Sequence, residues 1–170
     1  MSVNGCGFLT TIDRTIKYRC AMPVDSKSSD SYFDALSKVF RVYNFAGFKI
    51  TMIHCDGEFK SLMTKVETDL RCEINYATKD EHVDEAERNN RTIKERTRCA
   101  FQRLPFKAMP RLMLRVLVMN QTDMLNMFPV KGGISPYYSP RMILLQRNLN
   151  YNKHFTVPFG AYVQFSHQTT

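Results

Sequence analysis

The chain has 170 residues, 44% of them apolar, which suits a single globular domain with a sizeable core. No stretch approaches the roughly 20 apolar residues of a membrane span, and the amino-terminal residues lack the pattern of a signal peptide, so we expect an intracellular protein of the nucleus or cytoplasm that does not enter a membrane. A formal charge of +8 favours a polyanionic partner such as nucleic acid, although an ordinary basic protein can have the same composition.

The first half of the chain predicts alternating strands and helices. Residues 3–12 and 16–24 are β-prone runs separated by Asp13-Arg14-Thr15, which predicts a hairpin in which Met1 and Ser2 begin partway along the first strand. A helix capped by Ser29 or Asp30 should follow and stop near Gly47. The pattern then predicts a strand at residues 48–55, a weaker helix at 60–70, a short strand at 72–76 and a polar loop at 77–80.

A long helix is predicted from about residue 80 to residue 103. Its apolar stripe consists of Val83, Ala86, Ile93, Ala100 and Leu104, with Asn90 and Thr97 in the remaining positions. Glu87 lies one step from that stripe, and the same spacing places Arg91, Lys94 and Arg98 on its face. Such a row of cations suits a phosphate backbone, but a solvated basic face would have the same pattern.

The last part of the chain predicts two more helices. The first should start at Pro110 and run to about residue 127, and its almost continuously apolar section at residues 112–119 should be buried or form an interface. Its methionines favour core packing over a binding groove. Residues 128–136 form a loop without the features of a phosphate loop, and Ser139-Pro140 opens a short helix to residue 145. Residues 159–165 predict a strand. We therefore expect a core of residues 1–150 and an extension of residues 151–170, with the start of a small β module as one interpretation of the extension.

The five cysteines do not form a recognisable motif. They are scattered, odd in number and never in a C-x-x-C pair: Cys6, Cys20, Cys55, Cys72 and Cys99. This distribution predicts reduced core thiols rather than a zinc site or a disulfide framework.

Two carboxylates are the leading candidates for a functional site. Asp56 stands at the end of a predicted strand and Glu87 on the long helix, so a rigid scaffold could hold both at the spacing that a pair of divalent metals, about 3.5–4 Å apart, requires. Asp84 and Glu85 are alternatives to Glu87, but they point to other faces and suit the first turn of a helix. His54 and Cys55 lack metal-ligand spacing and are better explained by core packing. His82 is better explained as a neighbour of the helix cap.

These segments together resemble a known family. Asp56-Gly57-Glu58-Phe59 is similar to a segment of retrotransposon integrases, and residues 81–96 are similar to the stretch of copia-type integrases in which Val-x-x-Glu-Arg-x-x-Arg opens a long helix. Leu104-Pro105-Phe106, residues 126–135, Ser139-Pro140 and Phe159-Gly160 also recur there, in this order. Either acidic motif alone would be weak, but the resemblance covers nearly the whole chain.

The resemblance implies an α/β, RNase H-like fold: a mixed sheet of about five strands, the first three antiparallel, flanked by helices. It further implies that Asp56 and Glu87 are the second and third of three acids that bind Mg²⁺ or Mn²⁺, and that water or a DNA 3′-hydroxyl attacks a phosphodiester there. Arg88, Arg91, Lys94 and Arg98 would bind DNA. Members of the family act on nucleic acid, and we expect a homo-oligomer.

One part of the pattern is missing. In the family the first acid precedes a Val-Asn-Gly-like segment, here Val3-Asn4-Gly5, and would therefore fall just upstream of Met1. Asp13 is a poor substitute, because it follows the far end of the strand. We therefore expect a truncated or degenerate integrase-like domain that is inactive as it stands. Two hypotheses remain open: a strand-transfer or nuclease enzyme, and a noncatalytic domain that binds nucleic acid or self-associates through the 112–119 segment.

Overall fold

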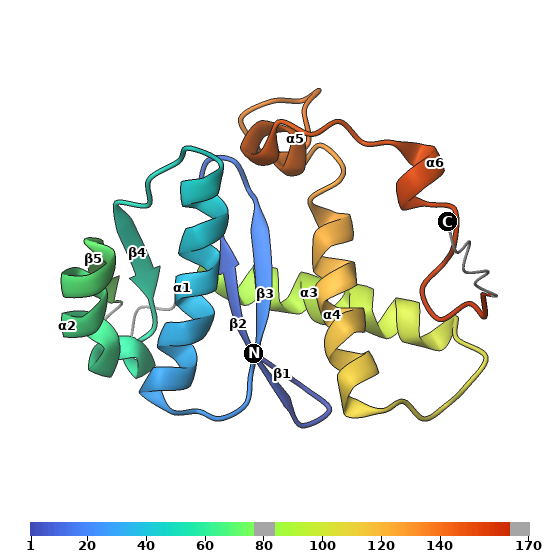
Figure 1. Ribbon diagram of the computed structural model, residues 1–170, viewed down its shortest axis with the longest axis horizontal. Coiled ribbons are helices and arrows are strands. Elements are labelled where there is room, and N and C mark those ends of the chain that lie inside the picture. Colours follow the sequence, from blue (N-terminus) through green and yellow to red (C-terminus); the bar gives the residue numbers. More distant parts are fainter. Residues whose placement is uncertain (77–83, 164–170) are drawn as a thin grey trace, which may run out of the picture.

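The strands form two small sheets, and helices cover both. The computed structural model describes residues 1–76 and 84–163, except for the side chain of Glu58. The predicted loop at 77–80 and His82 therefore lie outside the described residues. Figure 1 shows the strands in the left half of the molecule, α1 in front of them, α3 behind and α4 beside β3.

The first sheet contains three antiparallel strands, β1 (Ser2–Val3), β2 (Cys6–Ile12) and β3 (Arg19–Val24). The predicted hairpin is confirmed, with β2 and β3 paired from Gly7↔Val24 to Ile12↔Arg19. The predicted strand 3–12 is wrong at its start, because it breaks at Asn4 and Gly5, whose φ angles are 44° and 76°. Two successive left-handed residues form the tight turn that an Asn-Gly pair favours. Ser2 and Val3 therefore form a separate strand.

The second sheet contains two parallel strands, β4 (Met52–Cys55) and β5 (Glu73–Tyr76). The connection between them is helical throughout but irregular: a 3₁₀ turn η1 (Gly57–Leu62), a short α2 (Met63–Lys65) and a π turn η2 (Val66–Leu70). The five strands thus match the predicted number, but the expected single mixed sheet is divided into two in the described residues.

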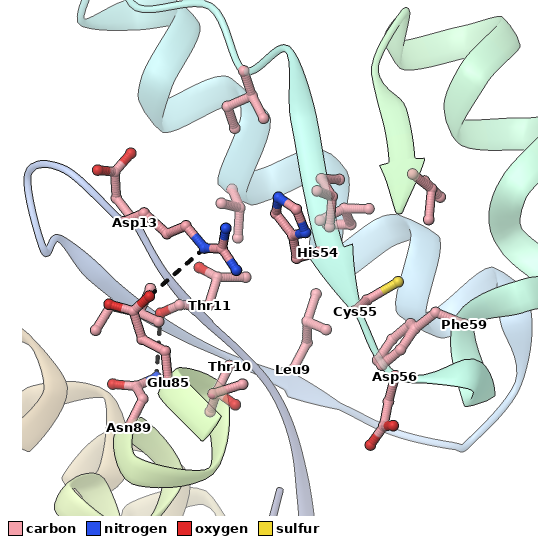
Figure 2. Close-up of a pocket in the computed structure, with 18 of the residues that line it drawn as sticks. Leu9, Thr10, Thr11, Asp13, His54, Cys55, Asp56, Phe59, Glu85 and Asn89 are labelled. Carbon is pink, nitrogen blue, oxygen red and sulfur yellow. Dashed lines mark hydrogen bonds and ion pairs between the residues drawn. The ribbon is translucent and has the colours of Figure 1, made fainter. Parts of the chain in front are cut away.

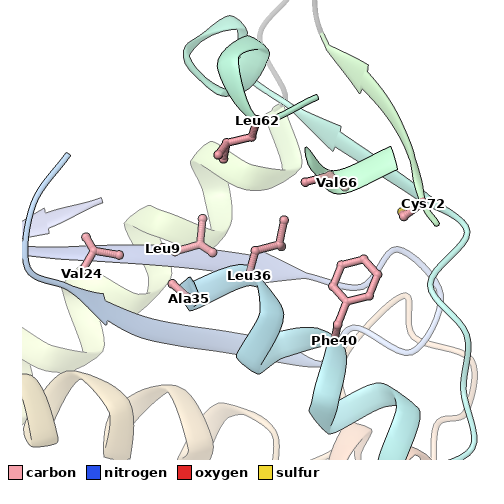
Figure 3. Close-up of a cluster of buried hydrophobic side chains, with 8 residues drawn as sticks. All are labelled: Leu9, Val24, Ala35, Leu36, Phe40, Leu62, Val66 and Cys72. Atoms are coloured by element: carbon pink, nitrogen blue, oxygen red, sulfur yellow. The ribbon is translucent and has the colours of Figure 1, made fainter. Parts of the chain in front are cut away.

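Helix α1 (Ser29–Phe45) covers one side of both sheets. Ser28, one residue before the predicted caps, accepts a hydrogen bond from the Ser31 backbone N–H, and the helix ends just before Gly47. Leu36 and Phe40 pack against Leu9 of β2 and Val66 of η2 (Figure 3). This cluster connects the two sheets, because Ile53 of β4 and Ile74 of β5 also pack against it.

Helices α3 (Asp84–Gln102) and α4 (Arg111–Leu125) cover the opposite side of the first sheet. Phe8 of β2 packs there against Ile93 of α3 and Leu114 of α4. Ile93 and Thr97 are buried as expected, whereas the third buried residue of α3, Asn89, was not part of the predicted stripe. A helix face that packs against a strand can bury a side-chain amide when backbone or side-chain groups form hydrogen bonds with it.

Helix α4 has two faces rather than being buried throughout. Leu114, Leu117 and Val118 lie in the core. Leu112, Val116 and Met119 are 73%, 47% and 37% exposed, so of the two predicted alternatives, a buried or an interface helix, burial does not hold for this side. Pro110 is the N-cap residue rather than the first residue of the helix.

The carboxyl-terminal part contains two short helices, α5 (Pro140–Leu145) and α6 (Tyr151–His154). Ser139 caps α5 as predicted and accepts a hydrogen bond from the Met142 backbone N–H. Residues 159–163 are turn and irregular structure, so the predicted strand does not form there, and residues 164–165 lie outside the described part. No helix in the described ranges is both long and apolar enough to span a bilayer.

All five cysteines are free thiols. Cys6, Cys20 and Cys72 are buried, as a core thiol should be. The expectation is wrong for Cys99, which is exposed because it lies on the outer side of α3.

Candidate metal and nucleic-acid site

Asp56 and Glu87 line the same cavity. It has a volume of about 450 Å³ and lies between β2, β4, α1 and the start of α3 (Figure 2). Asp56 follows the last residue of β4, and Glu87 lies in the first turn of α3; both are exposed. The chain therefore brings two acids that are 31 positions apart to one concave surface.

The end of β4 fixes the position of Asp56. The backbone C=O of Asp56 accepts a hydrogen bond from the Phe59 N–H at 3.0 Å, which turns the chain directly into η1. The Phe59 ring packs edge-on against Tyr32 of α1, with 5.2 Å between the ring centroids. The backbone at Asp56 is thus held by a paired strand on one side and a packed turn on the other.

Hydrogen bonds to the first sheet fix the start of α3 and with it Glu87. The Thr10 hydroxyl donates to Asn90 Oδ1 at 2.5 Å, and Arg19 Nε donates to Asn89 Oδ1 at 3.0 Å. Burial lowers the pKa of Arg19, and the nearby Glu85 carboxylate opposes this effect. These contacts place the helix turn that carries Glu87 beside β2.

The other acids considered for the site have structural roles or different surroundings. Glu85 forms an ion pair with Lys17 at 2.5 Å and lies 3.8 Å from Arg14. Asp13 Oδ1 accepts the backbone N–H groups of Thr15 and Ile16, as a turn residue does. Both residues line the cavity, but these contacts engage their carboxylates near the end of β2. Asp56 lies at the opposite end of the cavity (Figure 2).

The donor set fits one weakly held divalent cation. Carboxylate oxygens are the ligands that Mg²⁺ prefers. In residues 1–76 and 84–163 no group of three or more His, Cys, Asp or Glu side chains could hold a metal ion, so Asp56 and Glu87 are candidate ligands only as a pair. Two carboxylates do not fit a pair of cations, because they lack the charge that holds two cations close together.

Cys55 and His54 also line the cavity, and both are half-buried. Burial, and secondly the charge of Asp56, raise the pKa of the Cys55 thiol to about 11. The thiol is therefore protonated at neutral pH. Since a thiolate is the form that binds metals and acts as a nucleophile, Cys55 is suited to neither role.

The predicted DNA-binding cations form an exposed row on α3. Arg88, Arg91, Lys94 and Arg98 are all exposed, and the row extends over roughly 16 Å of helix beyond Glu87 at 1.5 Å per residue. Arg91 forms an ion pair with Glu95 at 3.0 Å, and Arg88 Nε donates to the Asp84 carbonyl at 3.4 Å. The opposite side of α3, around Ile93 and Thr97, is buried, so this row faces outward.

Thr10 and Asn89 contribute to the site although the sequence did not single them out. Thr10 lies in a β-prone run and has no distinctive neighbour. Two adjacent asparagines, Asn89-Asn90, in a strongly predicted helix were a usable signal, because asparagine is a poor residue for a helix interior unless its amide has a partner.

Comparison with known proteins supports the fold. No family model matches the sequence, and no match was found among curated proteins. Among solved structures, the catalytic core domain of BIV integrase has a TM-score of 0.57 and 13% identity to this chain, covering 86% of this chain and 90% of that domain. An identity this low shows fold alone. The chain therefore has the RNase H-like fold of an integrase catalytic core, with its strands divided into two small sheets.

Proposed function

We propose that this chain is the integrase-like core of a copia-type retrotransposon and that it binds DNA through α3 without cutting it. The observation that carries the proposal is the arrangement of α3: Glu87 faces the cavity that Asp56 also lines, and the row of exposed cations begins beside it. DNA bound to this row would lie over the carboxylates. Contacts of this kind hold the phosphate backbone and do not read sequence.

The register of β1 indicates where a further acid would have to lie to complete a catalytic site. Ser2 pairs with Gly7, and Met1 exchanges two backbone hydrogen bonds with Phe8, at 2.9 and 2.8 Å. Continued backwards, this register would place a residue two positions before Met1 opposite Thr10, on the face of Asn90. A carboxylate at that position would join Asp56 and Glu87, as the resemblance implies. With Asp56 and Glu87 as the only acids of the described residues at the proposed metal site, we expect one weakly bound Mg²⁺ or Mn²⁺ and no strand transfer.

The proposal is tested by measuring binding and cleavage separately. Fluorescence anisotropy with a labelled duplex, with and without Mg²⁺ at matched ionic strength, should give equal affinities, and gel electrophoresis should show no cleavage. Failure to bind duplex DNA would overturn the proposal. Mg²⁺-dependent cleavage that Asp56→Asn abolishes would instead establish the enzyme.

Cys55 offers a measure of metal binding that does not depend on activity. Asp56 raises the pKa of this thiol, so neutralising the carboxylate should lower the pKa and increase the thiolate fraction at a given pH. We expect Asp56→Asn, or millimolar Mg²⁺ added to the unaltered protein, to accelerate alkylation of Cys55 by iodoacetamide at pH 9 by about two- to tenfold, followed by mass spectrometry of its peptide. Alkylation of Cys99 serves as the internal control. An Mg²⁺ effect that persists in Asp56→Asn would contradict binding at Asp56.

Self-association is the second candidate function, and the exposed side of α4 favours it. Leu112, Val116 and Met119 follow one another at helical spacing and are all exposed. Burying such a stripe against a second copy would remove apolar area from water. We expect sedimentation velocity to detect a dimer at micromolar concentration and Val116→Asp to abolish it. A monomer at all concentrations would remove this candidate.

We also keep the division of the chain into a core of residues 1–150 and an extension of residues 151–170 as a proposal. Gly160 of the extension is packed on the core: a Cβ there would come within 2.6 Å of the Leu104 side chain. The described part of the extension, residues 151–163, is therefore better regarded as a segment attached to the core surface than as a separate module.

A further inference from the structure

A second groove lies between the carboxyl-terminal end of α1 and the end of α5. Its volume is about 620 Å³, within the range of roughly 300–1,000 Å³ that is usual for ligand pockets. No described residue lines both this groove and the cavity that contains Asp56. The groove is therefore a separate concave surface, which the proposed function does not use.

A buried cluster forms the floor of this groove. Leu144 of α5 is 0% exposed and packs with Tyr18, which precedes β3, and with Tyr43 of α1. The two tyrosine rings meet edge-on, with 6.2 Å between their centroids. Three further apolar side chains are half-buried against the cluster and line the groove: Val42, Ala46 and Leu145. The floor is therefore apolar and continuous with the core.

The rim of the groove is basic and aromatic. Arg41 and Phe45 are four positions apart on α1, so they lie on the same side of the helix, and Phe45 is 87% exposed. On the α5 side, Gln146 ends the helix in a left-handed conformation with a φ angle of 52°, and the exposed Arg147 follows it.

The two arginines of the rim are uncompensated. Within residues 1–76 and 84–163, neither Arg41 nor Arg147 forms an ion pair, and no Asp or Glu lines the groove. The groove thus combines two free positive charges with an apolar floor.

This combination favours an acidic peptide over nucleic acid. A guanidinium binds a carboxylate through two parallel hydrogen bonds, and an apolar floor accepts an aliphatic or aromatic side chain. Phosphates and sugars of a duplex would gain nothing from an apolar floor, and the exposed row on α3 suits them better. Arginine and phenylalanine are also enriched at interfaces between proteins.

We propose that the groove between α1 and α5 binds an acidic peptide of a partner protein, in which one or two large apolar side chains stand between carboxylates. The apolar side chains enter the groove against Val42 and Leu145, and the carboxylates pair with Arg41 and Arg147 at its rim. Buried anchors of this kind supply most of the binding energy of an interface. The inference does not depend on DNA binding, because it uses neither α3 nor Asp56.

The test uses the whole chain and a fluorescein-labelled peptide, Glu-Asp-Leu-Phe-Asp-Glu. We expect saturable binding by fluorescence anisotropy, which weakens as salt is added because the arginines are exposed. One control peptide carries glutamine and asparagine in place of the four acids, and another carries alanine in place of the leucine and phenylalanine. Each should bind about tenfold or more weakly. Equal binding of the three peptides, or none, would overturn the proposal.

Variants of the protein locate the bound peptide. Arg41→Ala combined with Arg147→Ala should weaken binding by about tenfold or more, and Phe45→Ala should also weaken it; all three side chains are exposed, so the core stays intact. Lys38→Ala combined with Lys131→Ala removes the same charge outside the groove and should retain the affinity. Equal losses in the two double variants would overturn the proposal, because net charge alone would then attract the peptide.

Two further measurements distinguish other occupants of the groove. Displacement of the bound peptide by duplex DNA would mean that nucleic acid and peptide share one site. Loss of self-association in Arg41→Ala combined with Arg147→Ala, measured by sedimentation velocity without peptide, would mean that a second copy of the chain covers the groove. Either result would overturn the proposal, whereas peptide binding that neither DNA nor self-association affects supports it.

Discussion

Replacing Arg91, Lys94 and Arg98 together by alanine should weaken duplex DNA binding by about 10- to 100-fold at low salt. Each of these side chains is exposed on one face of α3, so the substitutions remove three charges without opening the core. If each contacts a phosphate, the slope of log K against log salt should become less steep by about 0.9 per contact, or roughly 2.7 in total. The measurement is a salt titration of anisotropy with a labelled duplex.

A matched variant tests whether DNA affinity depends on where the positive charges lie or only on how many there are. Lys38, Arg41 and Lys49 are exposed on α1 and the segment after it, and replacing all three by alanine changes the net charge by the same amount. This variant should retain most of the affinity and nearly the original salt slope. Equal losses in the two variants would mean that overall charge, and not α3, determines binding. The ion pair between Arg91 and Glu95 is exposed, so its loss should have little effect on stability.

Asn126→Ala should be the most destabilising of the polar substitutions considered, by about 2–6 kcal/mol in free energy of unfolding. Asn126 is 1% exposed, and its amide bonds both the N–H and the C=O of Arg19, at 2.8 and 2.7 Å. Alanine would leave two backbone groups at the edge of β3 without these partners, each at a cost of about 1–3 kcal/mol. Urea denaturation followed by circular dichroism measures the loss.

Asn44→Ala is the control, because Asn44 is exposed near the end of α1. Its effect should lie within about 0.5 kcal/mol. Asn126→Asp should also be destabilising, because it keeps an acceptor for the Arg19 N–H but removes the donor to the C=O and buries a charge. A loss below about 1 kcal/mol for Asn126→Ala would show that water replaces the amide at this edge.

The two edges of the first sheet have different surroundings. Asn126 closes the outer edge of β3 with a side-chain amide, and this contact also joins α4 to the sheet. The cavity edge of β2 lies beside the carboxylates that we propose for metal binding.

Several elements were predictable because local patterns determine them. The apolar spacing of α1, the long periodic run of α3 and the Ser139-Pro140 start of α5 each gave the correct element to within a few residues. The Asn4-Gly5 turn carried an equally local signal, which the β-prone run around it concealed. Local sequence also placed Asp56 at the end of a strand, where β4 does end at Cys55.

Contacts between segments that are distant in the sequence determined the sheet arrangement, the assembly of the candidate site and the pattern of burial. The sequence by itself determined the order of helices and strands, the basic row on α3 and the candidate acids, because these depend on residue spacing within one element. Only the tertiary structure showed that the five strands divide into two sheets, that Glu85 is occupied by Lys17, and that Asp56 and Glu87 line one cavity. It also decided that α4 exposes an apolar side and that Asn126 is buried, because burial depends on which element packs opposite, and periodicity carries no such information.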